Sequence, residues 1–319
     1  MQVFRALDEF PSDFGPTVIA IGNFDGVHCG HRWIIEHARS RARELGARCI
    51  AVTFDPHPVR VLRPAFAPKL ITPMPERLRL LAETGLDATV VLPFTEAFSH
   101  MPAETFAGNV LRERLHAVEV HEGDSFRFGY QAQAGIAELI KLGEQFGFAV
   151  VAHHMRTVRG WPVSSSEIRQ RIAAGDMTAA RALLGRPFSI LSTPASGRGI
   201  GTKETVPTIN LAPYFELLPA NGVYITRMKI GDGPDALTFN SVTNAGNRPT
   251  FGEPSFAVES HLLDFQPVLL SEDTPLELTF LKRIRAEQRF PSPEALKAQI
   301  LRDVAYAMRY FHLRRLFSK

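Results

Sequence analysis

The feature of this sequence that most restricts its fold is a set of short runs in the first half that are apolar at nearly every position. They cover residues 18–21, 49–54 ("CIAVTF"), 88–92 ("ATVVL") and 148–152 ("FAVVA"). A run without polar alternation is typical of a strand covered on both faces, as in a parallel sheet. Segments with helical spacing separate the runs, at residues 30–46, 75–84, 102–115 and 135–146. We therefore expect an open α/β sandwich built from βαβ units.

The pattern changes after residue 162. The stretch "SSSEIRQRIAAGDMTAARALLG" predicts two short helices, and a segment rich in Gly, Pro, Ser and Thr follows it. Four later stretches alternate polar with apolar residues, which predicts an antiparallel sheet or small barrel: "GVYITRMKI", "DALTFNSVTNAG", "FAVESHLLDF" and "PLELTFLKRIR". We expect two domains, residues 1–184 and 185–319.

A helix is expected at the end of the chain. Ser292 is a suitable N-cap, and Pro293 suits the first helical position. The apolar positions of this segment recur at helical spacing, so we expect them to pack onto the barrel as one stripe. They are Leu296, Ile300, Val304, Met308 and Phe311.

Composition narrows the class of protein. The formal net charge of +3 is spread over 319 residues, which suits a small anionic substrate better than a nucleic acid. The two cysteines are too few for a disulfide framework, and no apolar run reaches the roughly 18 residues that a membrane span needs. We expect a cytoplasmic protein without nucleic-acid or membrane partners, present as a monomer or weak homo-oligomer.

The first apolar run leads into "IGNFDGVHCGH" (residues 21–31). In an open α/β sheet, ligands bind at the carboxyl edge of the strands, where the N-terminus of the next helix attracts phosphate. Glycines in this turn let the backbone approach a ligand closely. His28 and His31 could then donate hydrogen bonds to phosphoryl oxygens as negative charge develops. Two alternatives stay open: the histidines and Cys29 could be metal ligands, or the histidines could be purely structural.

Three further motifs follow in the first half. "TFDPHP" (residues 53–58) closes the second apolar run with an extended turn at the same sheet edge. "EGDSFRFGYQAQAG" (residues 122–135) is a loop suited to a flat ring or a phosphate. "VSSSEIR" (residues 163–169) offers three hydroxyls and an arginine at a helix start, which suits the departing phosphates of a nucleoside triphosphate, although the serines could equally be N-caps.

In this order, these motifs resemble the bacterial bifunctional riboflavin kinase/FAD synthetases, whose N-terminal half is an adenylyltransferase of the HxGH superfamily. The resemblance continues in "LLGRPFSI", "PTIN", "LLPANGVY", "NAGNRPTFGE", "VESHLLDF" and "SPEALKAQILRD", which look like the riboflavin kinase barrel. It implies that riboflavin is phosphorylated to FMN, and that FMN is adenylylated to FAD and pyrophosphate. It also implies ATP as the co-substrate and Mg²⁺ as the metal ion.

The resemblance also implies roles for individual residues. Catalytic roles fall to His28, His31, Arg169 and, as the kinase base, Glu259. ATP and phosphate contacts fall to Gly22, Asn23, Phe24, Gly26, Gly30, Ser164, Ser165 and Ser166, and in the kinase loop to Gly197, Gly199 and Gly201. Flavin contacts fall to Asp55, His57, Asp124, Phe126, Arg127, Phe128 and Asn247. Mg²⁺ in the kinase domain is assigned to Thr208 and Asn210.

One departure from the family pattern lies in the kinase half. "GIGTKETVPTIN" is about four residues longer than the usual connection, and Ile209 replaces the usual alanine. The altered loop keeps a second hypothesis open, an FMN adenylyltransferase whose kinase domain is weakened or inactive and serves to bind flavin. A third is a flavin-binding regulatory module without turnover. No GxxxxGK[ST] motif is present, so a P-loop kinase is not expected.

Overall fold

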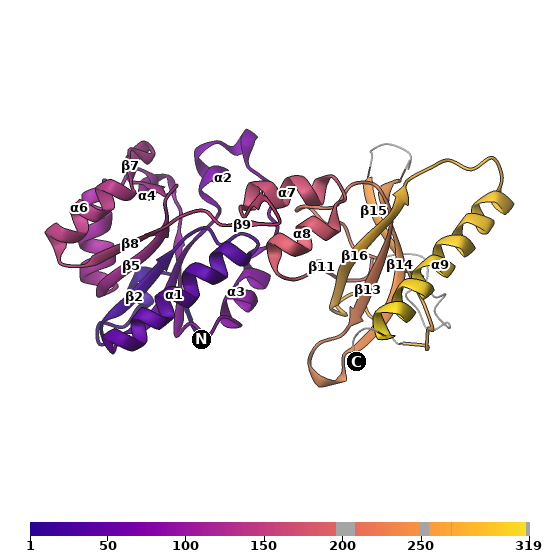
Figure 1. The fold of residues 1–319 in the computed structure, drawn as a ribbon, viewed down its shortest axis with the longest axis horizontal. Helices are drawn as coiled ribbons and strands as arrows, with labels where there is room; N and C mark the ends of the chain where they lie inside the picture. The colour runs from indigo at the N-terminus through magenta and orange to yellow at the C-terminus, as the bar shows by residue number, and fades with distance from the viewer. Residues whose placement is uncertain (196–207, 249–254, 269, 317–319) are drawn as a thin grey trace. The chain divides into compact units, whose positions relative to one another are not determined.

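The structure is a computed structural model that describes residues 1–195, 208–248, 255–268 and 270–316 (Figure 1). Its chain divides into two compact units, Met1–Ser165 and Ser166–Lys319. The expected domain limits, 1–184 and 185–319, stay a prediction.

The first unit is built on a six-stranded sheet in which every pairing is parallel. The strand order is β1-β4-β3-β2-β5-β8. The strands are β1 (Gln2–Phe4), β2 (Thr17–Ile21), β3 (Arg48–Asp55), β4 (Ala88–Pro93), β5 (Ala117–Gly123) and β8 (Ala149–His153). The four apolar runs form four of these strands, which confirms the predicted parallel sheet. Strands β1 and β5 were not predicted.

The helices of the first unit lie where the periodicity predicts them. They are α1 (Cys29–Leu45), α3 (Met74–Ala82), α5 (Ala103–Thr105) with its π-helical continuation η3 (Phe106–Arg114), and α6 (Ile136–Phe146). Shorter elements are η1 (Leu7–Glu9), α2 (Pro58–Leu62), η2 (Pro64–Phe66), α4 (Glu96–Ser99), β6 (Arg127–Phe128), η4 (Tyr130–Ala132), β7 (Ala134–Gly135), β9 (Thr157–Val158) and β10 (Trp161–Pro162).

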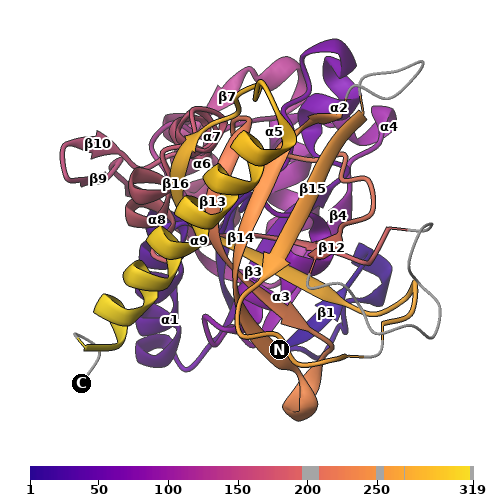
Figure 2. The same cartoon turned by 90° about the vertical axis from the view of Figure 1, so that its right-hand side faces the viewer.

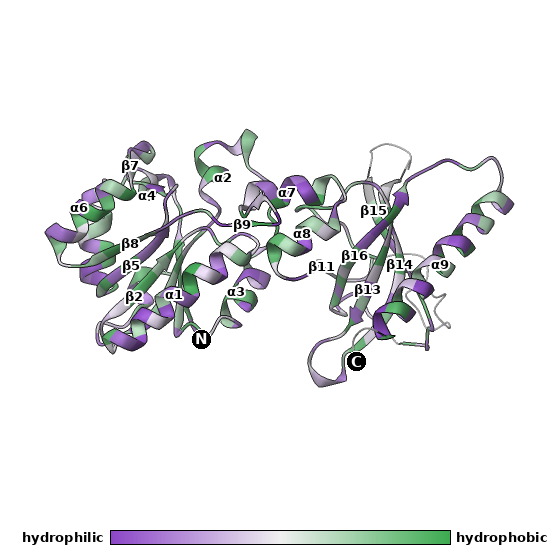
Figure 3. Cartoon of the chain, viewed as in Figure 1, coloured by the Kyte–Doolittle hydropathy of each residue, from purple (hydrophilic) through white to green (hydrophobic). Residues whose placement is uncertain are grey.

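Two hydrophobic cores sandwich the sheet. All five residues of β2 are buried, and its four apolar residues alternate between the cores. Val18 and Ala20 pack with Ile35 of α1, whereas Ile19 and Ile21 join the core that η3 and α6 cover. Each large apolar side chain buried in this way contributes about 1.5–3 kcal/mol. Figure 3 shows hydrophobic colouring along these central strands. Because both faces are covered, the sheet can present a ligand only at its edges.

The second unit consists of α7 (Ser165–Ala173), α8 (Met177–Leu184), an antiparallel sheet and the long helix α9 (Pro293–Leu316). The strand order is β11-β16-β13-β14-β15-β12. These strands are β11 (Phe188–Ser192), β12 (Thr208–Asn210), β13 (Gly222–Ile230), β14 (Leu237–Arg248), β15 (Ser255–Leu262) and β16 (Leu276–Ala286). The connection between β13 and β14 holds η5 (Gly233–Asp235).

The two edge strands of this sheet meet just beyond their ends. Pro194 forms a bridge with Leu211, and the Ala195 N–H donates to the Asn210 carbonyl at 2.8 Å. The Ala212 N–H likewise donates to the Thr193 carbonyl at 2.8 Å. These contacts close the sheet at one end and satisfy edge groups that an open sheet would expose. The predicted small antiparallel barrel is thereby confirmed.

Helix α9 begins where the sequence predicts, since the Ser292 Oγ accepts a hydrogen bond from the Ala295 N–H at 3.2 Å. The predicted apolar stripe is only partly right. Val304 and Phe311 of the stripe pack against the core together with Ala307, which was not predicted, but Leu296, Ile300 and Met308 are 42–52% exposed. Hydrophobic and hydrophilic residues recur around α9 rather than on separate faces (Figure 3), so its packing is set by a few positions. Figure 2 shows α9 lying across the strands.

Within the described part of the chain, no helix combines the length and the apolar character that crossing a membrane requires.

Candidate nucleotide-binding site

The turn after β2 is held in an unusual backbone conformation. Phe24 and Val27 have φ angles of 47° and 37°, and Gly26 has a φ of 89°. For residues other than glycine such angles cost free energy and persist only where surrounding contacts impose them. The strain coincides with the phosphate-binding motif that the sequence predicts.

Asp25 provides the contacts that hold this turn, and sequence reasoning missed it. Its carboxylate is buried and accepts hydrogen bonds from the backbone N–H groups of Ile71 and Thr72 at 3.1 and 2.9 Å. The Thr72 Oγ1 accepts in turn from the Gly26 N–H at 2.8 Å, and the Ser165 Oγ donates to the Asp25 carbonyl at 2.9 Å. Asp25 therefore ties the turn to segments far away in the sequence, which no local pattern could indicate.

His28 and His31 together form the start of α1. The His28 Nδ1 accepts from the His31 N–H at 3.3 Å, and the His31 Nδ1 accepts from the His28 N–H at 3.4 Å. This reciprocal capping box satisfies backbone donors at the helix N-terminus and stacks the two rings 3.5 Å apart. Because each Nδ1 accepts, a neutral ring carries its proton on Nε2. A structural role and a functional role are therefore compatible in these histidines: Nδ1 caps the helix, and Nε2 lies on the opposite side of each ring.

Two of the glycines around the histidines lie where a Cβ atom would crowd a neighbouring side chain. A Cβ on Gly30 would lie 3.2 Å from the His28 ring and 3.4 Å from Val163 Cγ1. A Cβ on Gly22 would lie 3.3 Å from the Phe24 ring. Only glycine leaves the His28 and Phe24 rings where they are.

A cavity of about 240 Å³ opens beside this turn. The predicted residues that line it are Gly22, Asn23, Phe24, His28, Gly30, His31, Asp124, Ser164 and Ser165. Residues that were not predicted also line it, among them Trp33, Glu122, His153, His154 and Arg156. The structure thus brings the glycine turn, the end of β5 and the serines before α7 to one place at the carboxyl edge of the sheet.

A series of polar contacts connects Arg41 of α1 to His153, which lines this cavity. The Arg41 guanidinium donates to the Glu119 carboxylate at 3.0 Å, and Glu119 Oε1 lies 2.8 Å from His121 Nε2. His121 Nδ1 lies 2.9 Å from His153 Nε2. The His153 ring contacts Trp33 edge-on at 4.8 Å between ring centroids. Charged residues within the β5 segment "AVEVHEG" were the one signal in the sequence for this chain of contacts.

Burial is the main influence on the pKa values of His121 and His153 in this series of contacts. It lowers the pKa of His153 to about 4, with His121 and His37 adding to the effect, and it lowers the pKa of His121 as well. Burial alone would raise the pKa of Glu119, but hydrogen bonds from Arg41 and His121 outweigh it and hold the value below normal. At neutral pH the two imidazoles are therefore neutral beside an ionised carboxylate. Burial also raises the pKa of Glu122 well above its usual range.

The motif "TFDPHP" lies at the same sheet edge, as predicted. The Thr53 Oγ1 donates to the Asn23 carbonyl at 3.3 Å, which joins the end of β3 to the glycine turn. Asp55 is exposed at the end of β3, and His57 caps α2 through its Nδ1, which accepts from the Val59 N–H at 3.3 Å.

The "FRFG" segment divides between surface and core. Asp124 lines the cavity, and its carboxylate lies 3.1 Å from His154 Nδ1. Phe126 and Phe128 stack on one another with centroids 5.3 Å apart, and Phe128 is buried in the core beside α6. Arg127 is exposed on β6, which pairs with β7 at Gly135. Direct flavin contact by these residues stays a prediction.

Ser166 and Arg169 lie on the first turns of α7, at the beginning of the second unit. The helix N-terminus predicted for "SSSEIR" is therefore present, starting at Ser165. Whether these two side chains reach the phosphates of a nucleotide stays a prediction.

The predicted kinase residues share one face of the barrel sheet. Asn210 of β12 pairs directly with Glu259 of β15, and Glu259 pairs on its other side with Asn244 of β14. Thr208 pairs with His261, and the Thr208 Oγ1 lies 3.4 Å from His261 Nδ1. Directly paired residues point to the same face of a sheet, so Thr208, Asn210 and Glu259 lie together. Asn247 lies on β14, whereas Gly197, Gly199 and Gly201 fall outside the described residues.

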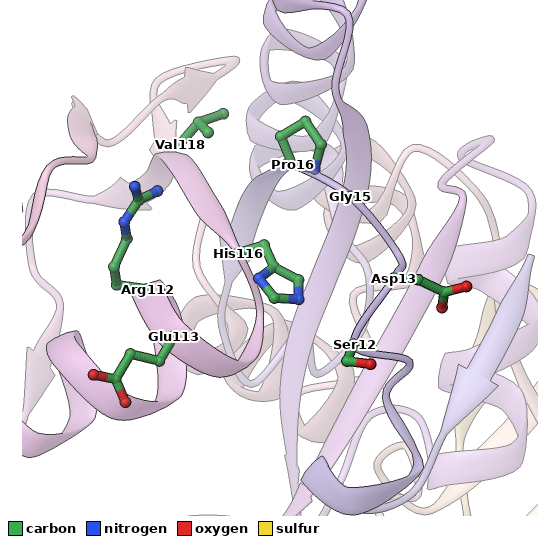
Figure 4. A pocket seen from close by; sticks show the side chains of 8 residues that line it. All are labelled: Ser12, Asp13, Gly15, Pro16, Arg112, Glu113, His116 and Val118. Carbon is green, nitrogen blue, oxygen red and sulfur yellow. The ribbon is translucent and has the colours of Figure 1, made fainter.

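A second cavity lies at the opposite edge of the first unit's sheet, before β2 and β5 begin (Figure 4). Its polar side chains are Ser12, Asp13, Arg112, Glu113 and His116. Figure 4 shows that their charged ends point in different directions. They do not converge on a common point, and the cavity lacks a helix N-terminus, so it is a weaker candidate.

Fold and site together define a nucleotide-binding α/β unit with an HxGH phosphate turn, joined in one chain to a small antiparallel barrel. Family models match both parts: FAD synthetase over residues 11–167, and riboflavin kinase over residues 184–311. The chain belongs to the bifunctional riboflavin kinase/FMN adenylyltransferases, the enzymes that make FMN and FAD. This confirms the family and the pair of activities that the sequence motifs predict.

Relatives of this name match along nearly the whole chain. The protein from Haemophilus influenzae is 31% identical over 98% of this chain and 100% of its own length. Those from Escherichia coli K12 and Pseudomonas fluorescens are 33% and 34% identical, over 93% and 96% of this chain and 93% and 97% of their own. A solved structure described as a macrolide-efflux protein from Streptococcus pneumoniae has the same fold, with a TM-score of 0.81 and 24% identity over 96% of this chain and 98% of that one.

Proposed function

We propose that the cavity beside the glycine turn binds ATP and is the place where FMN is adenylylated. The observation that carries this proposal is the capping box of α1. It fixes two imidazole rings at a helix N-terminus with their Nε2 protons on the side away from the backbone. Such donors suit phosphoryl oxygens, and the helix N-terminus adds a favourable field for an anion.

In the proposed reaction, a phosphate oxygen of FMN attacks the α-phosphorus of ATP. The bond from that phosphorus to the oxygen of the departing pyrophosphate breaks, so the products are FAD and pyrophosphate. Negative charge grows on the oxygens around the phosphorus, where the Nε2–H groups of His28 and His31 stabilise it. Gly22 and Gly30 allow the close approach, and Arg169 with Ser166 is proposed to hold the pyrophosphate.

For the kinase reaction we propose the shared face of β12 and β15. Glu259 would accept the proton of the terminal ribityl hydroxyl of riboflavin as that oxygen attacks the γ-phosphorus of ATP, releasing ADP. Thr208 and Asn210 would hold Mg²⁺, since hydroxyl and amide oxygens are hard donors that suit this ion and lie on the same face as Glu259. When bound, Mg²⁺ neutralises phosphate charge.

Two variants separate the reactions within one protein. The double variant His28→Ala, His31→Ala should lose FAD formation by at least about tenfold, roughly 1.4 kcal/mol of barrier, and still convert riboflavin to FMN. The variant Glu259→Gln should lose FMN formation and still convert supplied FMN to FAD. The measurement is chromatographic separation of the flavins after incubation with ATP and Mg²⁺.

Each variant serves as the folding control for the other, because one activity is expected to persist in each. Wild-type FAD formation by the histidine variant would refute the roles given to His28 and His31. If the wild-type protein converted FMN but left riboflavin untouched, the hypothesis of an adenylyltransferase with an inactive kinase domain would replace the kinase assignment.

A further inference from the structure

The cavity has a polar end whose hydrogen-bonding pattern is fixed by groups outside it. Glu119 is held ionised by Arg41, so it can only accept, and His121 must present its Nε2 proton to it. A neutral His121 then has no proton on Nδ1, and this atom can only accept from His153 Nε2 at 2.9 Å. The tautomer of His153 follows: its proton is on Nε2, and Nδ1 is an acceptor.

This acceptor is available to a ligand. His153 lines the cavity, and its Nδ1 makes no hydrogen bond to any residue in the part of the chain that the structure describes. The ring is kept in place by stacking on His121, with centroids 5.1 Å apart, and by the edge-on contact with Trp33. Trp33 follows Gly30 by one helical turn of α1, and both line the same cavity as the phosphate turn.

We propose that His153 Nδ1 accepts a hydrogen bond from the nucleoside of the ATP bound in this cavity, with His121 and Glu119 as positioning residues that fix its tautomer. The inference rests on the proposed adenylyl transfer. ATP offers two kinds of donor that fit this chemistry, the 6-amino group of adenine and the ribose hydroxyls. An acceptor with a fixed tautomer binds ATP better than an analogue that lacks the donor group. The analogue binds less well because it leaves the buried acceptor without a hydrogen bond.

The test compares kcat/KM for adenylylation of saturating FMN by ATP and three analogues. Purine riboside triphosphate lacks the 6-amino group, and the 2′-deoxy and 3′-deoxy forms of ATP each lack one hydroxyl. For the wild-type enzyme, kcat/KM should be about tenfold higher with ATP than either with the analogue that lacks the 6-amino group or with one that lacks a ribose hydroxyl. The analogue that is used less well identifies the donor. His153→Phe keeps an aromatic ring against Trp33 and removes the acceptor, so the preference should fall to about twofold or less.

The matched control is His100→Phe, since His100 is an exposed histidine on the turn after α4 that does not line this cavity. It should keep the wild-type preference. A readout without turnover is the ¹⁵N NMR spectrum of histidine-labelled wild-type protein, in which the signal lost in His153→Phe should show a protonated Nε2 and an unprotonated Nδ1.

Three results would overturn the inference. They are equal use of ATP and all three analogues by the wild type, an unchanged preference in an active His153→Phe enzyme, and a proton on Nδ1 of His153. Because the wild-type comparison of ATP with the three analogues does not depend on the variant, a His153→Phe protein that fails to fold does not remove the test. A wild-type enzyme that makes no FAD from ATP and FMN would refute the proposed function instead.

Discussion

At the scale of single residues, the first turn of α1 combines two tasks in the same side chains. The Nδ1 atoms of His28 and His31 replace the usual serine or aspartate cap, and the same rings carry the Nε2 atoms to which we assign the phosphate contacts. The sequence allowed the spacing of the histidines to be recognised. It could not indicate the capping box, because the reciprocal bonds depend on the ring orientations that Gly30 permits.

Gly30→Ala tests this dependence. The added Cβ would meet the His28 ring at 3.2 Å, so the ring must move by a few tenths of an ångström and its Nε2 with it. FAD formation should fall by about tenfold or more, since displacement of a positioned donor is costly in a transition state. Riboflavin kinase activity of the same sample should be unchanged. An enzyme with normal FAD formation would show that the ring position is not critical.

At the scale of elements, β5 shows why sequence reasoning missed part of the sheet. A strand carrying Glu119, His121 and Glu122 does not look like a buried run, yet all three are buried. Burial is tolerable for Glu119 and His121 because Arg41 of α1 and His153 of β8 supply their hydrogen bonds. Those partners come from other elements, so the local sequence of β5 could not indicate them.

Helix α9 is likewise held by a polar residue whose partner lies on another element. The position that anchors it is the buried Asp303, which accepts from the Arg285 Nε at 3.0 Å and from the Gln299 Nε2 at 2.8 Å. Asp303→Ala should lower the unfolding free energy of the second unit by roughly 2–4 kcal/mol, because it removes the buried carboxylate that pairs with the Arg285 guanidinium. Denaturant unfolding would measure the change.

The matched control for Asp303→Ala is Leu301→Ala, on the same helix, where the side chain is 60% exposed. Its unfolding free energy should change by less than about 0.5 kcal/mol. Equal effects of the two substitutions would mean that the ion pair of Asp303 is not what anchors α9.

At the scale of the whole molecule, the order of strands and helices was largely predictable from the sequence. The pH dependence of the unfolding free energy was not, because it depends on tertiary contacts. His153 has a pKa near 4 in the folded protein and near 6.5 in an unfolded chain. Its stabilising contribution is complete above about pH 6.5 and is lost as the pH falls towards 4, because the unfolded state binds the proton more tightly. The groups facing it are His37 of α1 and His121 of β5, and Glu119 and Arg41 follow in the contacts beyond His121.

The expected result is a fall in the unfolding free energy of the first unit between pH 7 and pH 4.5, and a smaller fall in His153→Phe. Denaturant titrations at several pH values, followed by the fluorescence of Trp33 and Trp161 in the first unit, would measure both. Parallel pH curves for the two proteins would contradict the burial of a neutral His153.

The contacts of Asp25 have a consequence for how the enzyme becomes active during its synthesis. The phosphate turn is complete only when Asp25 has met Ile71 and Thr72 and when Ser165 has reached the Asp25 carbonyl. A nascent chain that has emerged only as far as α1 contains both histidines and all the glycines of the motif but lacks the partners that hold their geometry. Affinity for ATP should therefore appear late, once the last residues of the first unit have emerged, and it can serve as a sensor of completed folding.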